Sequence, residues 1–474
     1  MKFVSTRKGL VATSAETVFQ GLAPDRGLYV PEVGEGLEGL GGLEGLGGLG
    51  GLGGLGGLEG LKGAEEFVLS RLFDDLPQSV RDEAVERLLQ RFPKEDPIPL
   101  VEKDGFRFLE LFHGKTGAFK DVALSMLPVF MRHAANGRKV LILTATSGDT
   151  GSAAMQGFAG VEGTEIIVFY PATGTSKIQR LQMTTPAEKN VHAVGIRGNF
   201  DDAQAAVKRI FADPEMAKAA AQAGFALSSA NSINTGRLVP QIAYYVMAGA
   251  KLGKAFDVVV PSGNFGNILA AYYAKMLGTP IRRFVVASNV NDVLARFVKT
   301  GVYDPGPTFT VTNSPSMDIR KSSNVERLLW ILNDGENAEV ARLMDDLETK
   351  GRYELKDSAK ARLFADFEGG VASPEETEAE MRRMREKAGY LLDPHTAVAT
   401  VVARKLGLPR AGFPCVIAAT ATPYKFPETC RRAFGEEVLV DPPPSFRKLE
   451  KLPVVQKEIC GVDEIDSFIR KVMR

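Results

Sequence analysis

The stretch DVVVPSGNFGNILAAYYA, residues 257–274, begins as an apolar run, continues into a turn with two glycines, and ends with the apolar spacing of a helix. A run that is apolar almost throughout is typical of a parallel strand covered on both faces. In the turn, Gly263 and Gly266 allow backbone N–H groups to approach an anion, and the N-terminus of the following helix favours negative charge. The stretch therefore predicts a strand–turn–helix unit with an anion site at the end of the strand.

The same alternation of short apolar runs with helical patterns continues along most of the chain. A second turn of this type, ATSGDTGSAA at 145–154, also joins an apolar run to a helix. Further runs with strand character lie at 140–146, 165–171, 191–196, 282–288 and 415–421. This alternation predicts the α/β class, with open, mostly parallel sheets that carry helices on both faces and bind ligands at the carboxyl ends of the strands.

The N-terminal part of the chain has a different composition. We expect a small N-terminal domain at 1–95 and a larger region of two α/β lobes at 96–474, the smaller lobe at about 120–250. Residues 34–63 consist almost entirely of Gly and Leu, with Leu at every third position from Leu37 to Leu61. A period of three produces neither a helical face nor a strand face. This segment is predicted to be a flexible linker, and a leucine-lined docking surface is the alternative.

The composition disfavours several classes of protein. Lys and Arg number 58, and so do Asp and Glu, so no excess positive charge is present to bind nucleic acid. The three cysteines have no other Cys or His at metal-ligand spacing, so neither a disulfide framework nor a metal site is expected. The sequence shows no apolar signal region and no run of 18 uncharged apolar residues. We therefore expect a cytoplasmic protein without a membrane segment.

The segment LELFHGKTGAFKDVALSML, residues 109–127, places Lys120 at the start of a predicted helix. Its Gly114-Lys115-Thr116 is similar to the end of a P-loop, but Leu109 stands where that motif requires glycine, so an ATP site is not predicted. A lysine in a partly dry pocket has a lowered pKa and reacts with carbonyl groups. Taken alone, a lysine at the start of a helix is more often a solvated surface residue. Together with two anion-binding turns it indicates a cofactor that has an aldehyde and a phosphate, such as pyridoxal 5′-phosphate.

Many motifs occur in order along the chain, and together they resemble the threonine synthase family. They include LFHGKTGAFKD (111–121), TSGDTGSAA (146–154), QMTT (182–185), SANSINTGRL (229–238), SGNFGNI (262–268), SPSMDI (314–319), DPHTAV (393–398) and TATPYKFPE (420–428). The resemblance implies a pyridoxal-phosphate enzyme of fold type II, related to the tryptophan synthase β chain. It implies an enzyme that converts O-phospho-L-homoserine and water to L-threonine and phosphate, with the catalytic region at 96–474. It also implies a monomer or a homodimer.

The resemblance also implies roles for individual residues. Lys120 would form the aldimine with the cofactor and move protons at the substrate carbon atoms. Thr420 would bond the pyridine nitrogen. The residues expected to hold the cofactor phosphate are Gly263, Asn264, Phe265, Gly266 and Asn267. The residues expected to meet the substrate, chiefly its carboxylate, are Ser147, Gly148, Asp149 and Thr150.

The chain departs from the family motifs at three places. Lys115-Thr116-Gly117 replaces Pro-Thr-Leu, Lys177 replaces the proline of a Ser-Pro pair, and Thr422 replaces a histidine. Lys115 is predicted to bind the substrate phosphate, since it lies in the loop that approaches the cofactor, although it could also be a solvated lysine. These departures leave two other functions open. One is a pyridoxal-phosphate-dependent serine or threonine dehydratase or a phospho-amino-acid phospholyase, and the other is a non-enzymatic assembly protein.

Overall fold

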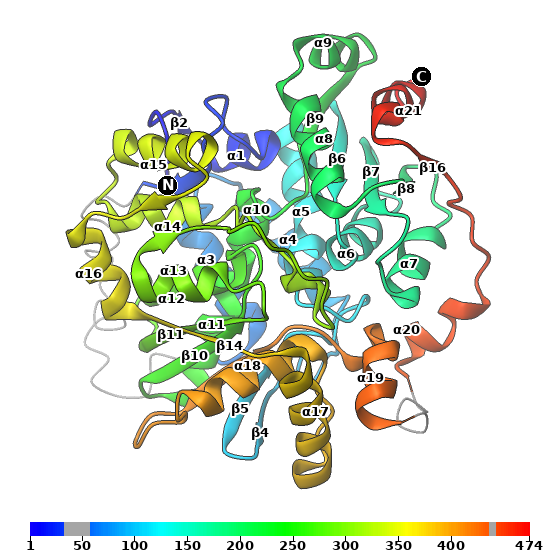
Figure 1. Cartoon of the computed structure of the whole chain (residues 1–474). Helices are drawn as coiled ribbons and strands as arrows, with labels where there is room; N and C mark the ends of the chain where they lie inside the picture. The colour runs from blue at the N-terminus through cyan, green and yellow to red at the C-terminus, as the bar shows by residue number, and fades with distance from the viewer. Residues whose placement is uncertain (33–56, 436–441) are drawn as a thin grey trace.

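The computed structural model describes residues 1–32, 57–435 and 442–474, and it contains two lobes, each built on a largely parallel β-sheet (Figure 1). The sheet of the larger lobe has the order β14 (Phe367–Val371), β11 (Ile281–Ser288), β10 (Phe256–Pro261), β15 (Cys415–Ala419), β5 (Phe106–Glu110) and β4 (Leu100–Lys103). The sheet of the smaller lobe has the order β16 (Ile459–Cys460), β8 (Val191–Ile196), β7 (Thr164–Pro171), β6 (Lys139–Ala145) and β9 (Phe225–Ser229). All strand pairs in these two sheets are parallel except β4 with β5. The predicted fold class is confirmed.

Two small antiparallel sheets complete the strands. They are β2 (Val11–Ala12), β1 (Phe3–Ser5) and β3 (Tyr29–Pro31), and the pair β12 (Val302–Tyr303) and β13 (Tyr353–Glu354).

Helices cover both large sheets because the strands between them are apolar on both faces. Those of the N-terminal region and the smaller lobe are α1 (Ser14–Gln20), α3 (Leu61–Leu72), α4 (Gln78–Leu89), α5 (Lys120–Ala135), α6 (Asp149–Phe158), α7 (Lys177–Thr184), α8 (Phe200–Ala212) and α9 (Pro214–Gln222). Those that follow are α10 (Thr235–Leu238), α11 (Pro240–Leu252), α12 (Gly266–Met276), α13 (Val293–Thr300), α14 (Val325–Leu332), α15 (Asn337–Thr349), α16 (Asp357–Asp366), α17 (Pro374–Ala388) and α18 (Pro394–Lys405). The C-terminal part has α19 (Pro427–Phe434), α20 (Pro444–Arg447) and α21 (Ile465–Val472), and short 3₁₀ turns include η1 (Pro315–Met317) and η2 (Pro423–Lys425).

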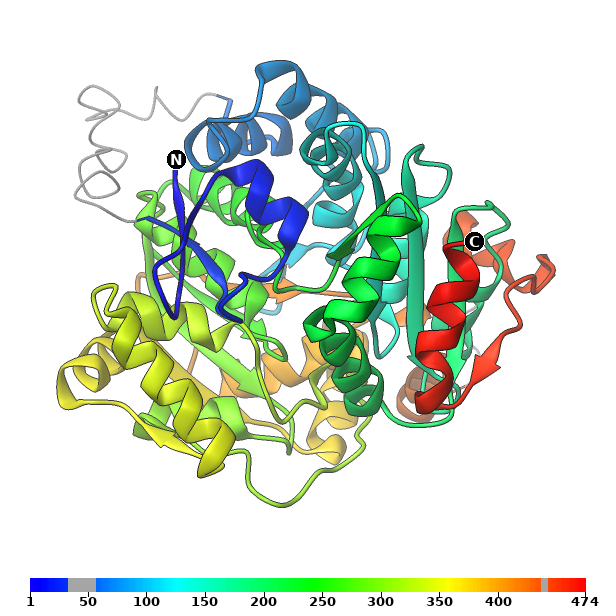
Figure 2. The same cartoon turned by 90° about the horizontal axis from the view of Figure 1, so that it is seen from above.

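The two ends of the chain are packed onto the lobes. Phe3 and Val68 from the N-terminal region belong to the same apolar cluster as Leu124 of α5 and Tyr244 of α11. At the other end, α21 lies against the smaller lobe, where β16 extends the sheet beyond β8 (Figure 2). The structure adds the C-terminal strand β16 to the smaller lobe. The domain boundary at residue 95 and the limits of about 120–250 for the smaller lobe stay predictions.

The linker prediction for 34–63 is wrong at its C-terminal end. Residues 33–56 lie outside the described residues, but Leu61 is 2 % exposed and begins α3. Leu58 packs against the same apolar cluster. The sequence pattern missed this because the apolar spacing of α3 starts inside the Gly/Leu segment.

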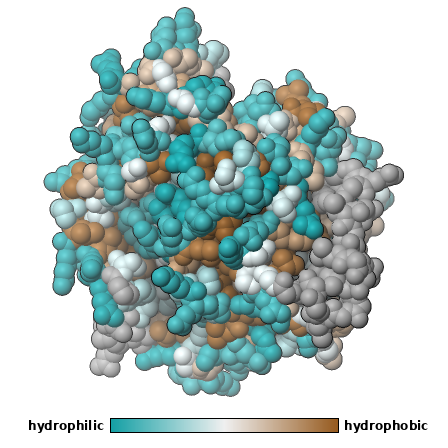
Figure 3. Space-filling view, turned by 180° about the vertical axis from the view of Figure 1, so that it is seen from behind, coloured by the Kyte–Doolittle hydropathy of each residue, from teal (hydrophilic) through white to brown (hydrophobic). Residues whose placement is uncertain are grey.

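The described ranges contain no helix that is long and apolar enough to cross a membrane. On the face seen in Figure 3, hydrophilic residues predominate, and hydrophobic residues show between them.

Glu65 in α3 is a buried acid without a hydrogen-bond partner among the described residues. Its side chain is 0 % exposed, and both carboxyl oxygens are unpaired. Burial raises the pKa of Glu65 well above its usual value. A carboxyl with a raised pKa in the folded state lowers stability as pH rises from its unfolded pKa towards its folded pKa.

We predict that Glu65→Gln stabilises the protein increasingly as pH rises above about 4.5, by about 1.4 kcal/mol per pH unit within that window. Urea unfolding of both proteins between pH 5 and 8 measures this difference. The neighbouring Glu66 is exposed, so Glu66→Gln is the matched control and should follow the wild-type pH dependence. If the free energy of unfolding changes with pH in the same way for Glu65→Gln and wild type, ionisation of Glu65 in the folded protein costs little free energy, and the prediction is wrong.

Candidate active site

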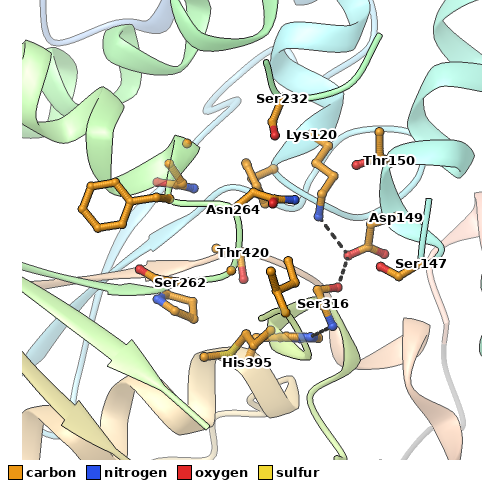
Figure 4. A pocket seen from close by; sticks show the side chains of 18 of the residues that line it. Lys120, Ser147, Asp149, Thr150, Ser232, Ser262, Asn264, Ser316, His395 and Thr420 are labelled. Carbon is orange, nitrogen blue, oxygen red and sulfur yellow. Dashed lines mark hydrogen bonds and ion pairs between the residues drawn. The ribbon is translucent and has the colours of Figure 1, made fainter. Parts of the chain in front are cut away.

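A pocket lies where the carboxyl ends of strands from both large sheets face each other (Figure 4). Ser147 follows β6, Ser262 follows β10 and Thr420 follows β15, and all three line it. Asn231 and Ser232 enter from the segment after β9. This is the position at which an α/β fold binds its ligands.

Lys120 is the first residue of α5, and its side chain projects into the pocket. The side chain is 14 % exposed, and Nζ donates a hydrogen bond to Oδ2 of Asp149 at 3.3 Å. Burial lowers the pKa of Lys120, and the cations Arg237 and Lys425 add to this effect, while Asp149 opposes it. A buried amine with a lowered pKa is suited to react with an aldehyde.

Asp149 is the centre of a buried hydrogen-bond network. Its Oδ1 accepts a hydrogen bond from Nε2 of Gln179 at 2.8 Å and lies 3.1 Å from Nζ of Lys425, and its Oδ2 accepts from the Ser316 hydroxyl at 3.1 Å. Burial alone would raise the pKa of Asp149, but the surrounding groups, led by Lys425 and including the Gln179 hydrogen bond, together outweigh burial and hold the pKa well below its usual range. An ionised carboxylate repels a substrate carboxylate, so the expected role of Asp149 at that group does not fit its environment.

The turn between β10 and α12 forms a concave backbone surface on the other side of the pocket. Gly263, Asn264, Phe265, Gly266 and Asn267 all line the pocket. Phe265 has a φ of 63°, a left-handed conformation that directs the chain into the 11-residue helix α12. A Cβ at position 263 would lie 2.5 Å from a backbone oxygen of the neighbouring loop, so glycine is required there.

Two side-chain amide atoms of this turn have no hydrogen-bond partner in the described part of the chain. They are the acceptor Oδ1 of Asn264 and the donor Nδ2 of Asn267. The turn is held by Ser322 and Asn324, whose side chains donate to the carbonyl oxygens of Gly263 (2.7 Å) and Asn264 (3.0 Å). A helix N-terminus with a free amide donor is a good site for a phosphate group.

The wall near Thr420 contains His395, which was not among the predicted site residues. Its Nε2 accepts a hydrogen bond from the backbone N–H of Ser316 at 3.1 Å, so its Nδ1 carries the proton and donates to Asp393 at 2.8 Å. His395 thus fixes the loop that brings the Ser316 hydroxyl to Asp149. The motifs DPHTAV and SPSMDI contained these residues, but only the folded chain shows that they meet.

Arg237 is a second lining residue that the prediction missed. It is 1 % exposed and uses Nη1 to donate to the carbonyl of Ala230 at 2.6 Å, while its Nε has no partner among the described residues. Burial lowers the pKa of Arg237 to about 10, so the guanidinium stays charged at neutral pH. Such a group is suited to bind an anion in the pocket.

The structure places several predicted residues away from the pocket. Lys115 is exposed and does not line it, and the cations that act on it are Arg87 of α4 and Arg91, which follows that helix. The position of Lys115 therefore contradicts the prediction that it binds the substrate phosphate. The N–H of Gly148 is already bonded to the Thr146 hydroxyl at 2.9 Å, so it is not free for a substrate.

The other departures from the family motifs also lie outside the pocket. Lys177 forms an exposed ion pair with Glu450 at 2.6 Å. Thr422 is buried, and its methyl group lies beside Gly117, where an added Cβ would approach it to 2.6 Å. Two departures, Gly117 and Thr422, are therefore spatial neighbours in a packing contact.

Comparisons with known proteins agree with this geometry. A family model described as "Pyridoxal-phosphate dependent enzyme" matches residues 108–418, and one described as "Threonine synthase, C-terminal" matches residues 396–469. The fold, the pocket and the first match together define a pyridoxal-phosphate-dependent enzyme of fold type II.

Two curated relatives and one solved structure narrow the family. The chain is 37 % identical to "Threonine synthase" of Pseudomonas aeruginosa over 444 residues, which cover 91 % of this chain and 90 % of that one. It is 31 % identical to "Threonine synthase" of Saccharomyces cerevisiae, covering 96 % and 93 %. The crystal structure of PLP-bound threonine synthase from Brucella melitensis superimposes over 100 % of both chains with a TM-score of 0.87 and 34 % identity. The chain belongs to the threonine synthase family, and the predicted cofactor and enzyme class are confirmed.

The residues present in the pocket fit pyridoxal 5′-phosphate. The turn before α12 offers a phosphate site with the unpaired Asn267 amide, and Lys120 is the buried amine for the aldehyde. Thr420 brings a neutral hydroxyl from the end of β15 to the same pocket.

The orientation of the Asn267 amide depends on Tyr245 of α11. The Tyr245 hydroxyl donates to Oδ1 of Asn267, which leaves Nδ2 as the group without a partner. We predict that Tyr245→Phe raises the Kd for pyridoxal 5′-phosphate about 5- to 10-fold, because one buried hydrogen bond of about 1 kcal/mol is lost and the amide can rotate. Fluorescence titration of the cofactor-free protein measures this change. Tyr273→Phe is the control, since the buried Tyr273 hydroxyl has no partner in the described ranges; equal effects of the two substitutions would contradict the role of Tyr245.

Proposed function

We propose that this enzyme converts O-phospho-L-homoserine and water to L-threonine and phosphate. The observation that carries the proposal is the presence, in one pocket, of a reactive lysine, a phosphate-binding turn and a separate buried arginine. The turn and the lysine account for the cofactor. The arginine is the group that remains for a second phosphate, which belongs to the substrate.

Pyridoxal 5′-phosphate, when bound, withdraws electrons from the substrate and so stabilises negative charge at its carbon atoms. Lys120 supplies the base that takes the Cα proton and returns a proton at a neighbouring carbon. Because burial lowers the pKa of Lys120, its ammonium group loses its proton more readily than that of a solvated lysine. Asp149 holds Nζ in the pocket through the 3.3 Å hydrogen bond.

Arg237 is proposed to bind the γ-phosphate of the substrate. Its unpaired Nε–H lies in a nearly dry site, where a charge-assisted hydrogen bond to a phosphate oxygen is strong. Thr150 and Ser147, at the N-terminal end of α6, are proposed to bind the substrate carboxylate, because their hydroxyl groups line the pocket beside a helix N-terminus.

Thr420 is proposed to form a hydrogen bond with the ring nitrogen of the cofactor. A hydroxyl group is neutral, so it does not hold that nitrogen protonated as a carboxylate would. The cofactor ring would then withdraw electrons from the substrate only moderately, so the reaction would depend more on proton transfer by Lys120.

The buried arginine also distinguishes this function from a serine or threonine dehydratase. A substrate without a phosphate would leave a buried guanidinium without a counter-charge, which is costly. The test is to incubate the cofactor-loaded enzyme with O-phospho-L-homoserine and to quantify both products. Equal amounts of threonine and phosphate are expected. Release of ammonia with a 2-oxo acid would support the dehydratase or phospholyase function instead.

A further inference from the structure

Lys425 is a fully buried lysine beside the pocket whose charge is not yet explained. It lies in the short turn η2, and its side chain is 0 % exposed. Its Nζ donates to the carbonyl oxygen of Thr116 at 2.9 Å and to Oε1 of Gln182 at 2.9 Å, and it lies 3.1 Å from Oδ1 of Asp149. All three ammonium protons therefore have acceptors, so Lys425 is a fixed positive charge and has no free electron pair to act as a base.

Asp149 lies between Lys425 and Lys120. Its Oδ1 faces Lys425 at 3.1 Å, and its Oδ2 faces Lys120 at 3.3 Å. Without Lys425, a buried carboxylate beside Lys120 would favour the ammonium form of Lys120, because opposite charges in a dry site attract strongly. With Lys425 in place, the Asp149–Lys425 pair has no net charge, so the attraction is reduced, and Arg237 reduces it further.

The other charged groups near Lys120 support the same balance. Lys425 and Arg237 are positive, and Asp149 and Asp121 can each carry one negative charge, so these four sum to zero when both acids are ionised. Asp121 accepts hydrogen bonds from the backbone N–H and hydroxyl of Thr116 at 2.8 and 2.7 Å. A proton on Lys120 would add an uncompensated positive charge to a buried site.

The only other titratable group of the described structure that acts on Asp149 from this wall is His395, and its ring is the neutral tautomer bonded to Asp393. His395 has a smaller effect on the pKa of Asp149 than Lys425 has, and Lys425 lies directly against Oδ1 of Asp149 at 3.1 Å.

We propose that Lys425 is a positioning residue that neutralises Asp149, so that Lys120 keeps a free amine while Asp149 still holds it by a hydrogen bond. A second contact of Lys425, the hydrogen bond to the Thr116 carbonyl, fixes the loop four residues before Lys120. This inference rests on the proposed function, in which Lys120 must be unprotonated to bind the cofactor aldehyde and to accept a proton from the substrate.

The test measures the protonation of Lys120 in the full-length, cofactor-free protein. Short pulses of acetic anhydride between pH 6 and 11 acetylate only neutral amines, and mass spectrometry of the Lys120 peptide gives its titration midpoint. The exposed Lys350 provides an internal standard. We expect Lys425→Met to raise the Lys120 midpoint by about one pH unit or more, the size of shift caused by a charge within about 4–6 Å. In the loaded enzyme, the acid limb of the kcat pH profile should move upward by a similar amount.

Two further comparisons control for the loss of any lysine and for misfolding of the Lys425→Met variant. Lys177→Met removes an exposed lysine from its pair with Glu450 and should leave the Lys120 midpoint unchanged. Because Lys425→Met removes the cation at Oδ1 of the buried Asp149 carboxylate and so costs stability, Asp149→Asn is compared with Asp149→Asn/Lys425→Met, in which that carboxylate is absent. The double variant should have the higher midpoint, since a repelling cation is removed. An unchanged midpoint in folded Lys425→Met, or equal midpoints in the second pair, overturns the proposal.

The failure of this inference and the failure of the proposed function give different results. If the wild-type enzyme does not form threonine but the Lys120 midpoint responds to Lys425 as described, the substrate assignment is wrong and the charge balance holds. If threonine is formed and the midpoint does not respond, the reverse is true.

Discussion

Replacing Lys120 by alanine is expected to reduce kcat by at least about 10³-fold while leaving the fold intact, because the described residues that line the pocket include no other lysine to bind the cofactor aldehyde and move the substrate protons. Lys120 opens α5 and lines the pocket, whereas Lys425, the other lysine at Asp149, does not line it. The fold should survive because the side chain makes one hydrogen bond and lines a cavity. Steady-state kinetics, circular dichroism and the visible spectrum of the cofactor measure these effects.

Lys177→Ala is the matched control for this substitution. It removes an exposed lysine from the first turn of α7 and should keep wild-type kcat and cofactor content. Borohydride reduction followed by peptide mapping locates the lysine that binds the cofactor. Reduction of the cofactor onto a lysine other than Lys120 in the wild-type enzyme would show that the assignment is wrong.

Arg237→Met is expected to lower kcat/KM for O-phospho-L-homoserine about 10- to 150-fold. This range corresponds to the loss of one charge-assisted hydrogen bond to the phosphate, which contributes about 1.5–3 kcal/mol. Methionine replaces the apolar stem of arginine with an unbranched apolar chain, so packing along the stem is retained while the guanidinium is removed. If the phosphate contact strengthens as the phosphate departs, kcat falls together with kcat/KM.

The comparison that isolates the phosphate is made with an amino-acid ligand that lacks it. Arg237→Met should bind such a ligand as tightly as wild type does, and Arg237→Lys should recover part of the lost activity because it restores the charge without the planar fork. Equal weakening of phosphorylated and unphosphorylated ligands would mean that Arg237 supports the segment at Ala230 rather than the substrate.

The sequence predicted the central strands well because each has its own local signal. The runs that became β6, β7, β10, β11 and β15 are apolar on both faces, a pattern that is local and strong. β16 has two residues and pairs with β8, more than 250 positions earlier in the chain, so nothing local distinguishes it from a loop. The start of α3 was hidden for a similar reason, since glycine-rich sequence continues into its first turn.

The site shows the same division between local and long-range information. Lys120 and the turn at 263–267 stand in motifs whose chemistry can be recognised within a few residues. The roles of Arg237 and Lys425 become visible only in the folded chain. Folding brings Arg237 into the pocket and Lys425 to Asp149, although each is distant from Lys120 and Asp149 in sequence. Lys115 shows the opposite error, because it is close to Lys120 in sequence but its side chain is exposed and lies outside the pocket.

The proposed reaction cleaves the carbon–oxygen bond of O-phospho-L-homoserine and adds water to the carbon skeleton. Turnover in H₂¹⁸O, with both products analysed by mass spectrometry, tests it most directly. We expect threonine that carries one ¹⁸O atom and phosphate that carries none. Homoserine with ¹⁸O-labelled phosphate would indicate hydrolysis at phosphorus, and 2-oxobutanoate with ammonia would indicate elimination without hydration; either result would contradict the proposed function.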